Sequence, residues 1–424
     1  FKSVNPVDRL LLKGLNFFAQ IIARTGVAIP SQPSTVKEIM RTYGTAGLTV
    51  YSGLTGDSPI KNWAGVGYTE FPNAYKLSDE SVIANQKRKY ACQACPMACG
   101  GIVDIKEGRY KGTVGHKPEY ETLCSFGGLI LHDDLDTVVE INELCNREGI
   151  DTISAGGAVA FAIECYKNGI IDDKQTKGLK LDWGKSAEIL KLTEMIIDRE
   201  GIGDLLADGV KRAAAKLGRG SEAYAVHAGG QELPMHDSRL DEGMGIAYQC
   251  EPTPGRHTIS SYLYGHLYQT KKRLPGTKKL ISAASGKDGK KVALYTGTSI
   301  LMQLINGSGV CEFGIMCSNL PLTDYLNTVT GWNLSRDDYM KTGERILSMR
   351  KAFNAREGVK PADSKLHFRA AGNPPLNAGP LKGKTVDMDN LESQFFTMMG
   401  WDPATGGPTK AKMAELGIAE LFSK

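Results

Sequence analysis

Hydrophobic residues recur along much of this chain at helical spacing. Between residues 133 and 218, apolar positions repeat every three or four residues in successive segments that end at glycines. This period is typical of amphipathic helices, and an Asp before an apolar run or a Gly after it marks where a helix begins or ends. The pattern predicts helices in residues 133–149, 152–169, 185–201 and 203–218. Because only short glycine turns separate them, we expect a helical domain with antiparallel neighbours.

The helical pattern stops near residue 226, where glycines and prolines interrupt the chain. The segment VHAGGQELPMHDSR has no helical period, and such punctuation is typical of loops. A chain of 424 residues also exceeds the usual size of one hydrophobic core. We therefore predict two domains, residues 1–225 and residues 226–424. Within the second domain the pattern predicts a surface loop over residues 270–291, a helix over 335–354 and a loop-rich tail over 372–407.

The first apolar run, LLLKGLNFFAQIIA in residues 10–23, predicts an amphipathic helix. It does not predict a membrane span, because the run is short and Lys13 interrupts it. The chain begins with Phe1 and shows no signal peptide, so we expect a processed or partial product.

Composition narrows the class of protein. The chain is 41% hydrophobic and 23% charged, which is ordinary for a soluble globular protein. A formal net charge of +4, without a basic block interleaved with aromatic residues, gives no indication of a nucleic-acid partner. The nine cysteines are an odd number and are not spread as a secreted disulfide framework, so we expect a reducing, cytoplasmic location.

The segment CQACPMAC concentrates candidate metal ligands, because it places Cys92, Cys95 and Cys99 within eight residues. Structural zinc sites usually use two short Cys or His pairs. A cubane iron–sulfur cluster is larger than a single zinc ion and is bound by four thiolates. The spacing favours a 4Fe–4S cluster, with zinc and buried structural thiols as alternatives. The fourth ligand is either Cys124 or Cys311, and spacing does not decide between them.

A series of short motifs, taken in order along the chain, resembles the aldehyde ferredoxin oxidoreductase family of tungsten–pterin enzymes. The motifs are YGTAG (43–47), PIKNW (59–63), CQACPMAC (92–99), PEYET (118–122), NELCNREGIDTISAGG (142–157), MHDSR (235–239), NGSGVC (306–311), GERI (343–346), FNAREG (353–358) and GWDPATGGPT (400–409). The resemblance implies a mainly α fold with the two helical domains of the family's C-terminal type. The family's N-terminal β-rich domain, which forms the base of the pterin site, is absent from this chain, so we expect it on a separate chain, lost or not included.

The resemblance also implies two cofactors, a 4Fe–4S cluster and a tungsten or molybdenum bis-pterin. In this family a D-x-x-G-L-C motif supplies the fourth cluster ligand, and its counterpart NGSGVC implies Cys311. That motif and the related NREGID imply pterin contacts from Asn146, Gly149, Ile150, Asp151, Asn306, Gly309 and Val310. Asn146 and Asn306 stand where the family has Asp, so each position loses a charge and gains an NH2 donor.

Three residues match the family's positions near tungsten. Glu121 in PEYET and His257 in GRHT correspond to the pair beside the metal. A buried Glu with a raised pKa can take a proton, and a His can stabilise negative charge on a carbonyl oxygen. Glu140 is a further carboxylate by the same match, although a solvated helix-face Glu is the commoner arrangement. The remaining histidines of interest, His227, His236 and His266, are interpreted as structural.

Cys124 stands two residues after PEYET, where aldehyde-oxidising members usually carry an aromatic residue. The benzoyl-CoA reductase branch of the family has a cysteine ligand on tungsten, so Cys124 is a candidate tungsten ligand. The alternative is a buried thiol that packs as a small hydrophobe. The same core role is predicted for Cys145, Cys165, Cys250 and Cys317.

The resemblance predicts oxidation of aldehydes to carboxylates, with electrons passed through the cluster to ferredoxin or an iron–sulfur subunit. Two alternatives stay open: the tungsten subunit of an aromatic ring reductase of the benzoyl-CoA reductase type, and a non-catalytic iron–sulfur electron-transfer or scaffold subunit. We expect an oligomer, with neither a nucleic-acid partner nor a membrane span.

Overall fold

The computed structural model describes residues 33–422, apart from residues 68 and 96. The helix predicted over residues 10–23 lies outside the described residues. Clustering of the described residues separates two compact units. Unit 1 comprises Glu38–Leu240 and His367–Thr385, and unit 2 comprises residues 33–37, Asp241–Leu366 and residues 386–422. The predicted domain boundary at residue 226 falls inside unit 1.

Helices dominate both units, which confirms the mainly α fold class: of the described residues, 54% are helical and 5% lie in strands. Helix α2 (Pro33–Tyr43) spans the boundary between the residue ranges of the two units. Unit 1 contains α3 (Thr49–Thr55), α4 (Asp79–Ala84), α5 (Tyr120–Ser125), α6 (Leu135–Glu148), α7 (Thr152–Lys167), α8 (Ser186–Ile197), α9 (Ile202–Leu206) and α10 (Val210–Leu217). Short 3-10 helices in unit 1 are η1 (Gly44–Leu48), η2 (Ala74–Leu77), η3 (Gly128–Ile130) and η4 (Ser221–Tyr224).

Three of the four predicted helices of unit 1 are present as α6, α7 and α8, and both ends of α6 show the expected capping chemistry. The Asp134 side chain accepts hydrogen bonds from the first backbone N–H groups of α6, and Gly149 ends that helix in a left-handed conformation with φ 69°. The prediction of a single helix over residues 203–218 is wrong, because two helices form there. Gly209, with φ 86° and ψ 160°, interrupts the segment and separates α9 from α10.

A small antiparallel sheet in unit 1 holds the cysteine motif. Its strands are β1 (Gln86–Tyr90), β2 (Gly100–Asp104) and β3 (Val114–His116), in the order β1-β2-β3. The cysteine segment is the connection between β1 and β2. A second antiparallel pair, β4 (His227–Ala228) and β5 (Gln231–Glu232), follows α10.

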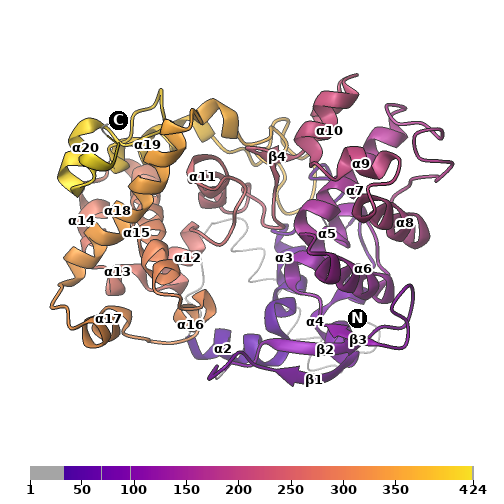
Figure 1. Cartoon of the computed structure of the whole chain (residues 1–424), viewed down its shortest axis with the longest axis horizontal. Coiled ribbons are helices and arrows are strands. Elements are labelled where there is room, and N and C mark those ends of the chain that lie inside the picture. The colour runs from indigo at the N-terminus through magenta and orange to yellow at the C-terminus, as the bar shows by residue number, and fades with distance from the viewer. Residues whose placement is uncertain (1–32, 68, 96, 423–424) are drawn as a thin grey trace. The chain divides into compact units, whose positions relative to one another are not determined.

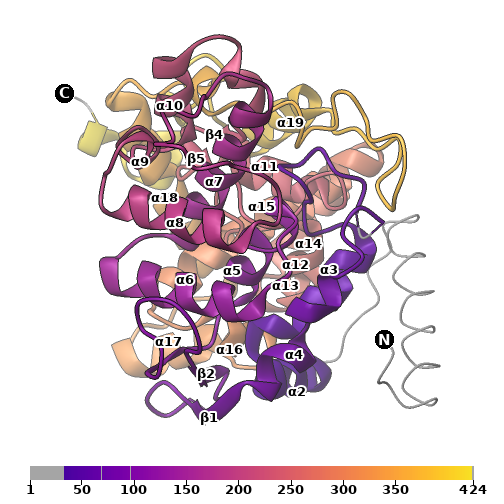
Figure 2. The same ribbon diagram turned by 90° about the vertical axis from the view of Figure 1, so that its right-hand side faces the viewer.

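The three-stranded sheet and α10 lie at opposite ends of unit 1, as Figures 1 and 2 both show. Helices α5, α6, α7 and α8 lie between them and pack on one another. This stack buries the apolar stripes that the sequence pattern predicts.

Unit 2 is organised around α15 (Gly286–Gly307), which contacts α12, α14, α18 and α19. Its helices are α11 (Glu242–Cys250), α12 (Tyr262–Leu267), α13 (Thr270–Arg273), α14 (Gly276–Ala283), α15, α16 (Glu312–Met316), α17 (Leu322–Thr330), α18 (Arg336–Arg356), α19 (Met388–Met399) and α20 (Lys410–Leu416), with 3-10 helices η5 (Pro361–Ser364) and η6 (Ala419–Phe422). Within the described part of the chain, no helix combines the length and the apolar character that a membrane crossing needs.

The loop predicted over residues 270–291 is helical and that prediction is corrected, whereas the tail predicted as loop-rich over 372–407 is mostly irregular but contains one helix. The lysine-rich segment 270–291 forms α13, α14 and the start of α15, because buried Leu274 and Thr277 alternate with its exposed lysines. The tail contains α19, whose Leu391, Phe395 and Phe396 are buried. In both segments the charged or glycine-rich composition predicted a loop, whereas tertiary packing stabilises a helix.

The close approach of α14 to α15 gives a test of the packing in unit 2. A Cβ atom added at Gly297 would lie 2.4 Å from the Thr277 side chain. We expect Gly297→Ala to lower the free energy of unfolding by about 1–3 kcal/mol through overpacking. Gly307→Ala, in the same helix, meets nothing closer than 3.8 Å and should not destabilise. Thermal unfolding of the two variants measures this, and equal midpoints would contradict it.

Candidate active site

The cysteine loop between β1 and β2 has a backbone shaped for a ligand. Cys92 is exposed, whereas Cys95 and Cys99 are half-buried. Ala94 and Ala98, each directly before a cysteine, have φ values of 58° and 52°. Non-glycine residues rarely adopt such angles, and turns of this kind point backbone N–H groups toward anionic groups such as iron–sulfur clusters. The loop therefore fits a metal–sulfur cluster.

The described cysteines form no disulfide. Cys311 is exposed and precedes α16 in unit 2. Its role as fourth cluster ligand stays a prediction. The four cysteines predicted to lie in the core are buried: Cys145, Cys165, Cys250 and Cys317.

The two predicted pterin motifs have the same local structure, one in each unit. In the first, Gly149 ends α6 with φ 69°, and the N–H of Ile150 donates to the carbonyl of Cys145 at 2.8 Å. In the second, Gly309 follows α15 with φ 71°, and the N–H of Val310 donates to the carbonyl of Ile305 at 3.2 Å. Each motif thus joins two helices through one left-handed glycine.

The last residue of each motif is the N-cap of the next helix. Asp151 caps α7 by accepting a hydrogen bond from Ser154 N–H at 2.8 Å, and Cys311 occupies the same position before α16. Asn146 and Asn306 are exposed on the helix that precedes each turn. Exposed amides beside a helix junction fit a ligand with a donor and acceptor edge, as a pterin has. Pterin binding by these motifs stays a prediction.

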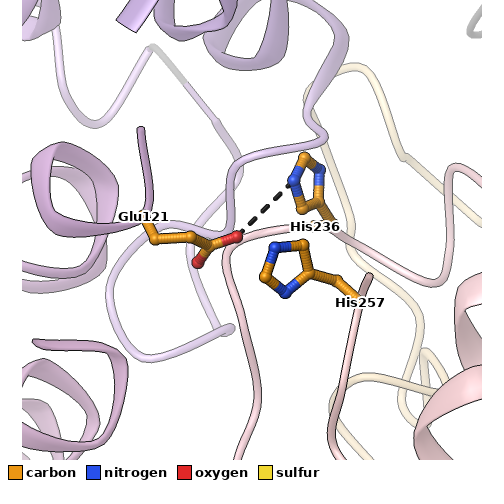
Figure 3. Close-up of side chains that lie close together, drawn as sticks. All are labelled: Glu121, His236 and His257. Carbon is orange, nitrogen blue, oxygen red and sulfur yellow. Dashed lines mark ion pairs between the residues drawn. The ribbon is translucent and has the colours of Figure 1, made fainter. Parts of the chain in front are cut away.

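Glu121 in α5 is mostly buried, with a side chain 15% exposed. Its Oε2 accepts a hydrogen bond from the N–H of Met235 at 2.8 Å, and its Oε1 lies 3.5 Å from Nε2 of His236. Figure 3 shows this ion pair between Glu121 and His236. The MHDSR segment therefore contributes both a backbone donor and an imidazole to the predicted catalytic carboxyl.

Two contacts fix the imidazole of His236. Its Nδ1 lies 2.8 Å from Oδ2 of Asp57, and its ring stacks on Tyr120 with the ring centres 4.8 Å apart. Asp57 follows Gly56, which ends α3 in a left-handed conformation with φ 82°. A Cβ atom at Gly56 would lie 2.9 Å from Leu381, so glycine suits this turn both sterically and conformationally.

Burial raises the pKa of Glu121 to about 7, although the nearby His236 and the Met235 N–H lower it in part. A carboxyl with this pKa is partly ionised at neutral pH and exchanges a proton readily there. The arrangement of Asp57, His236 and Glu121 can therefore hold and move one proton.

His236 is the site residue that the sequence prediction missed, because it was interpreted as structural. The signal was its place in MHDSR, one of the ordered motifs. His257 is half-buried in unit 2, between α11 and α12, and is also drawn in Figure 3. Its role beside Glu121 remains a prediction from the resemblance.

Glu140 has a different environment from Glu121. It is buried in α6, not solvated, and its Oε1 accepts a hydrogen bond from the N–H of Tyr110 at 3.2 Å. Burial raises its pKa. This hydrogen bond places Glu140 beneath the loop between β2 and β3, and its catalytic role stays a prediction.

Cys124 lies one turn after Glu121 in α5, and burial raises the pKa of its thiol to about 12. Without a metal this thiol stays protonated at neutral pH, whereas a bound metal would deprotonate it. Residues three apart share a helix face, so Cys124 has the position either to pack beside Glu121 or to reach a ligand there.

Comparison with known proteins agrees with these motifs. The family model "Aldehyde ferredoxin oxidoreductase, domains 2 & 3" matches residues 20–418. The chain is 32% identical over 392 residues to a tungsten-containing aldehyde ferredoxin oxidoreductase of Pyrococcus furiosus, and 31% identical over 392 residues to that of Thermococcus kodakarensis. Each match covers 90% of this chain and 60% of the relative, so the chain spans about three fifths of the length of these curated relatives.

Two further similarities extend the comparison. The chain is 26% identical over 388 residues to a WOR-like subunit of an aliphatic sulfonate oxidoreductase of Pyrococcus furiosus, covering 85% of this chain and 55% of that protein. Its fold is similar to a chain of the active-site complex of benzoyl coenzyme A reductase with 1,5-dienoyl-CoA. That match has a TM-score of 0.66 and 19% identity, and it covers 91% of this chain and 60% of the other.

The raised pKa of Glu121 is directly measurable. We expect a carboxyl that titrates near pH 7, because burial disfavours its charged form. Infrared difference spectra between acidic and alkaline solution should show this carboxyl in the wild type and lose it in Glu121→Gln. His236→Gln should move the midpoint upward, because the imidazole lowers the pKa of Glu121. A midpoint near the ordinary 4.5, or a signal that survives in Glu121→Gln, would contradict the assignment.

Proposed function

Because the chain belongs to the aldehyde ferredoxin oxidoreductase family, we propose that it forms the helical part of a tungsten or molybdenum pterin enzyme that oxidises aldehydes to carboxylates. The observation that carries the proposal is the buried carboxyl of Glu121, with a pKa of about 7 and with Nε2 of His236 3.5 Å from its Oε1. A non-catalytic scaffold has no need of such a group. Because the chain spans about three fifths of the length of its curated relatives, the activity of a whole enzyme is part of the proposal.

The residues that would hold the cofactors are those that the motifs predict. Cys92, Cys95 and Cys99, with Cys311, would hold the 4Fe–4S cluster. The exposed turns at residues 146–151 and 306–311 would hold the two pterins. When bound, the metallopterin supplies a two-electron acceptor and the cluster passes those electrons on singly.

The chain's own contribution to the reaction is the handling of protons. One aldehyde and one water yield one carboxylic acid, two protons and two electrons. Glu121 in its ionised form accepts a proton from the reacting centre, and Nε2 of His236 lies 3.5 Å from its Oε1 to take that proton onward. Asp57 holds Nδ1 of the same ring, so it orients the imidazole and stabilises its protonated form. His257 would donate a hydrogen bond to the carbonyl oxygen of the substrate.

The proposed partners follow from the same chemistry. Electrons leave through the cluster to ferredoxin or an iron–sulfur subunit, and a separate chain is one source of the family's N-terminal pterin-base domain. We also propose that the protein is an oligomer. A cytoplasmic location is consistent with its cysteines remaining reduced as thiols.

A second candidate function is reduction of an aromatic ring, in an enzyme of the benzoyl-CoA reductase type. It is favoured by one observation, the buried thiol of Cys124 one turn from Glu121. The resemblance implies a cysteine ligand on tungsten in that branch. Activity on small aldehydes supports the first function, and activity on aryl-CoA thioesters supports the second.

Substitution of the proposed base tests the first function. We expect Glu121→Gln to lower kcat/KM for an aldehyde by about 10²–10⁴-fold, because general base catalysis is lost while shape is kept. The wild-type rate should rise with pH through about 7 as Glu121 ionises, and this rise should be absent in the variant. The matched control is Glu107→Gln, an exposed carboxylate in the loop between β2 and β3. A variant that retains wild-type rates with normal metal content would rule out Glu121 as the base.

The role of Cys124 is tested by Cys124→Ser in the intact assembly. If Cys124 only packs, as the aldehyde-oxidising function requires, tungsten content should stay at the wild-type level and aldehyde oxidation should continue. Cys165→Ser, at another buried thiol, controls for the general effect of a buried hydroxyl. Loss of tungsten in Cys124→Ser alone would instead identify Cys124 as a metal ligand and favour the ring-reducing function.

A further inference from the structure

The segment around the cysteine loop carries a local excess of positive charge, as does the lysine-rich segment 270–291 of unit 2. Residues 86–117 contain seven Lys or Arg residues and two Asp or Glu residues, an excess of five. The whole chain has an excess of four, so the rest of the chain is slightly acidic. The seven basic residues are Lys87, Arg88, Lys89, Lys106, Arg109, Lys111 and Lys117.

Strand β1 presents part of this charge at an open edge of the sheet. The strand order β1-β2-β3 leaves β1 without a second neighbour in the sheet, and its residues from Lys87 to Tyr90 are exposed. Two residues after Tyr90 the chain reaches the exposed Cys92. The basic strand and the metal-binding loop are therefore one continuous surface.

One face of the sheet combines an exposed arginine with aromatic surface. Arg88 pairs with Ile102, which pairs with His116, so these three side chains share a face with Tyr90. The Tyr90 hydroxyl lies 2.9 Å from Nδ1 of His116, which holds the phenol ring across the sheet. Tyr90 remains 36% exposed. We name the group Arg88, Tyr90 and His116 the docking face.

Arg88 is the basic residue of β1 whose charge is available to a partner. Lys87 forms an ion pair with Asp104 at 2.6 Å, and the ammonium group of Lys89 contacts the backbone carbonyl of Arg41. Among the residues that the structure describes, none forms an ion pair or hydrogen bond with the Arg88 guanidinium. Arg and Tyr are the residue types most enriched at the centres of protein interfaces.

We propose that the docking face binds an acidic iron–sulfur electron-transfer protein, which exchanges single electrons with the cluster held by Cys92, Cys95 and Cys99. This inference rests on the proposed cluster and names the surface at which its partner binds. Electron exchange needs close approach, and this basic surface directly borders the exposed Cys92. A bound cluster would give one electron to the oxidised partner in each encounter, so the two electrons from one aldehyde would reduce two partner molecules. Charge complementarity would mainly raise the association rate.

The test measures binding of a purified acidic ferredoxin to the holoenzyme, isolated anaerobically from its native source or expressed as variants. Calorimetry at low and high salt gives the affinity. We expect Arg88→Glu to weaken binding about three- to tenfold at low salt and to reduce its salt dependence, with Arg88→Gln in between. The matched control is Arg212→Glu, which makes the same charge change at an exposed residue of α10, at the opposite end of unit 1 (Figures 1 and 2). Iron content should be unchanged in all variants.

Measuring ferredoxin binding and aldehyde oxidation separately distinguishes a failure of the docking face from a failure of the proposed function. If aldehyde oxidation with a small neutral redox dye is absent while ferredoxin binding still depends on Arg88, the function is wrong and the docking face stands. Wild-type affinity in Arg88→Glu, equal weakening in Arg212→Glu, or no ferredoxin binding by the wild type would each overturn the docking face. Stronger binding to acidic lipid vesicles than to ferredoxin would also overturn it.

Discussion

The burial of the Glu121 carboxyl beside a fixed imidazole is the interaction on which the proposed chemistry of unit 1 depends. Burial alone would keep the carboxyl protonated, and the imidazole and the Met235 N–H offset part of that effect, which leaves a pKa of about 7. The imidazole has this influence because Asp57 and Tyr120 prevent it from turning away. Three segments far apart in sequence, at residues 57, 120–121 and 235–236, must fold together before the site exists.

Much of the helical architecture of unit 1 was predictable, because local signals agree with the packing there. The caps at Asp134 and Gly149 mark α6 both in sequence and in structure. The prediction of one helix over residues 203–218 was wrong, because the apolar period continues through Gly209 although the backbone does not. The helix α14 was missed for the opposite reason: its lysines suggested a loop, and burial of Thr277 against α15 decides its structure.

The residues of the candidate site were predictable only where they stand in a recognisable sequence motif. Glu121 stands in such a motif, whereas the partnership of His236 with Asp57 depends on tertiary contacts over a long sequence separation. The backbone conformation of the PIKNW motif was also not predictable from local sequence. Lys61, Asn62 and Trp63 have φ values of 50°, 49° and 67°, and no local propensity favours such a run in non-glycine residues. It persists because Asn62 donates hydrogen bonds to Glu164 and to the Tyr224 carbonyl.

Proton handling at Glu121 and electron exchange at the cysteine loop are the two halves of one proposed redox enzyme. Both need a metal to connect them, so the metal content of the native assembly tests the central claim most directly. Protein purified anaerobically from its source should contain about four iron atoms and about one tungsten or molybdenum atom for each chain. Iron without tungsten or molybdenum would contradict the catalytic function, and zinc alone would also contradict the assignment of CQACPMAC to an iron–sulfur cluster.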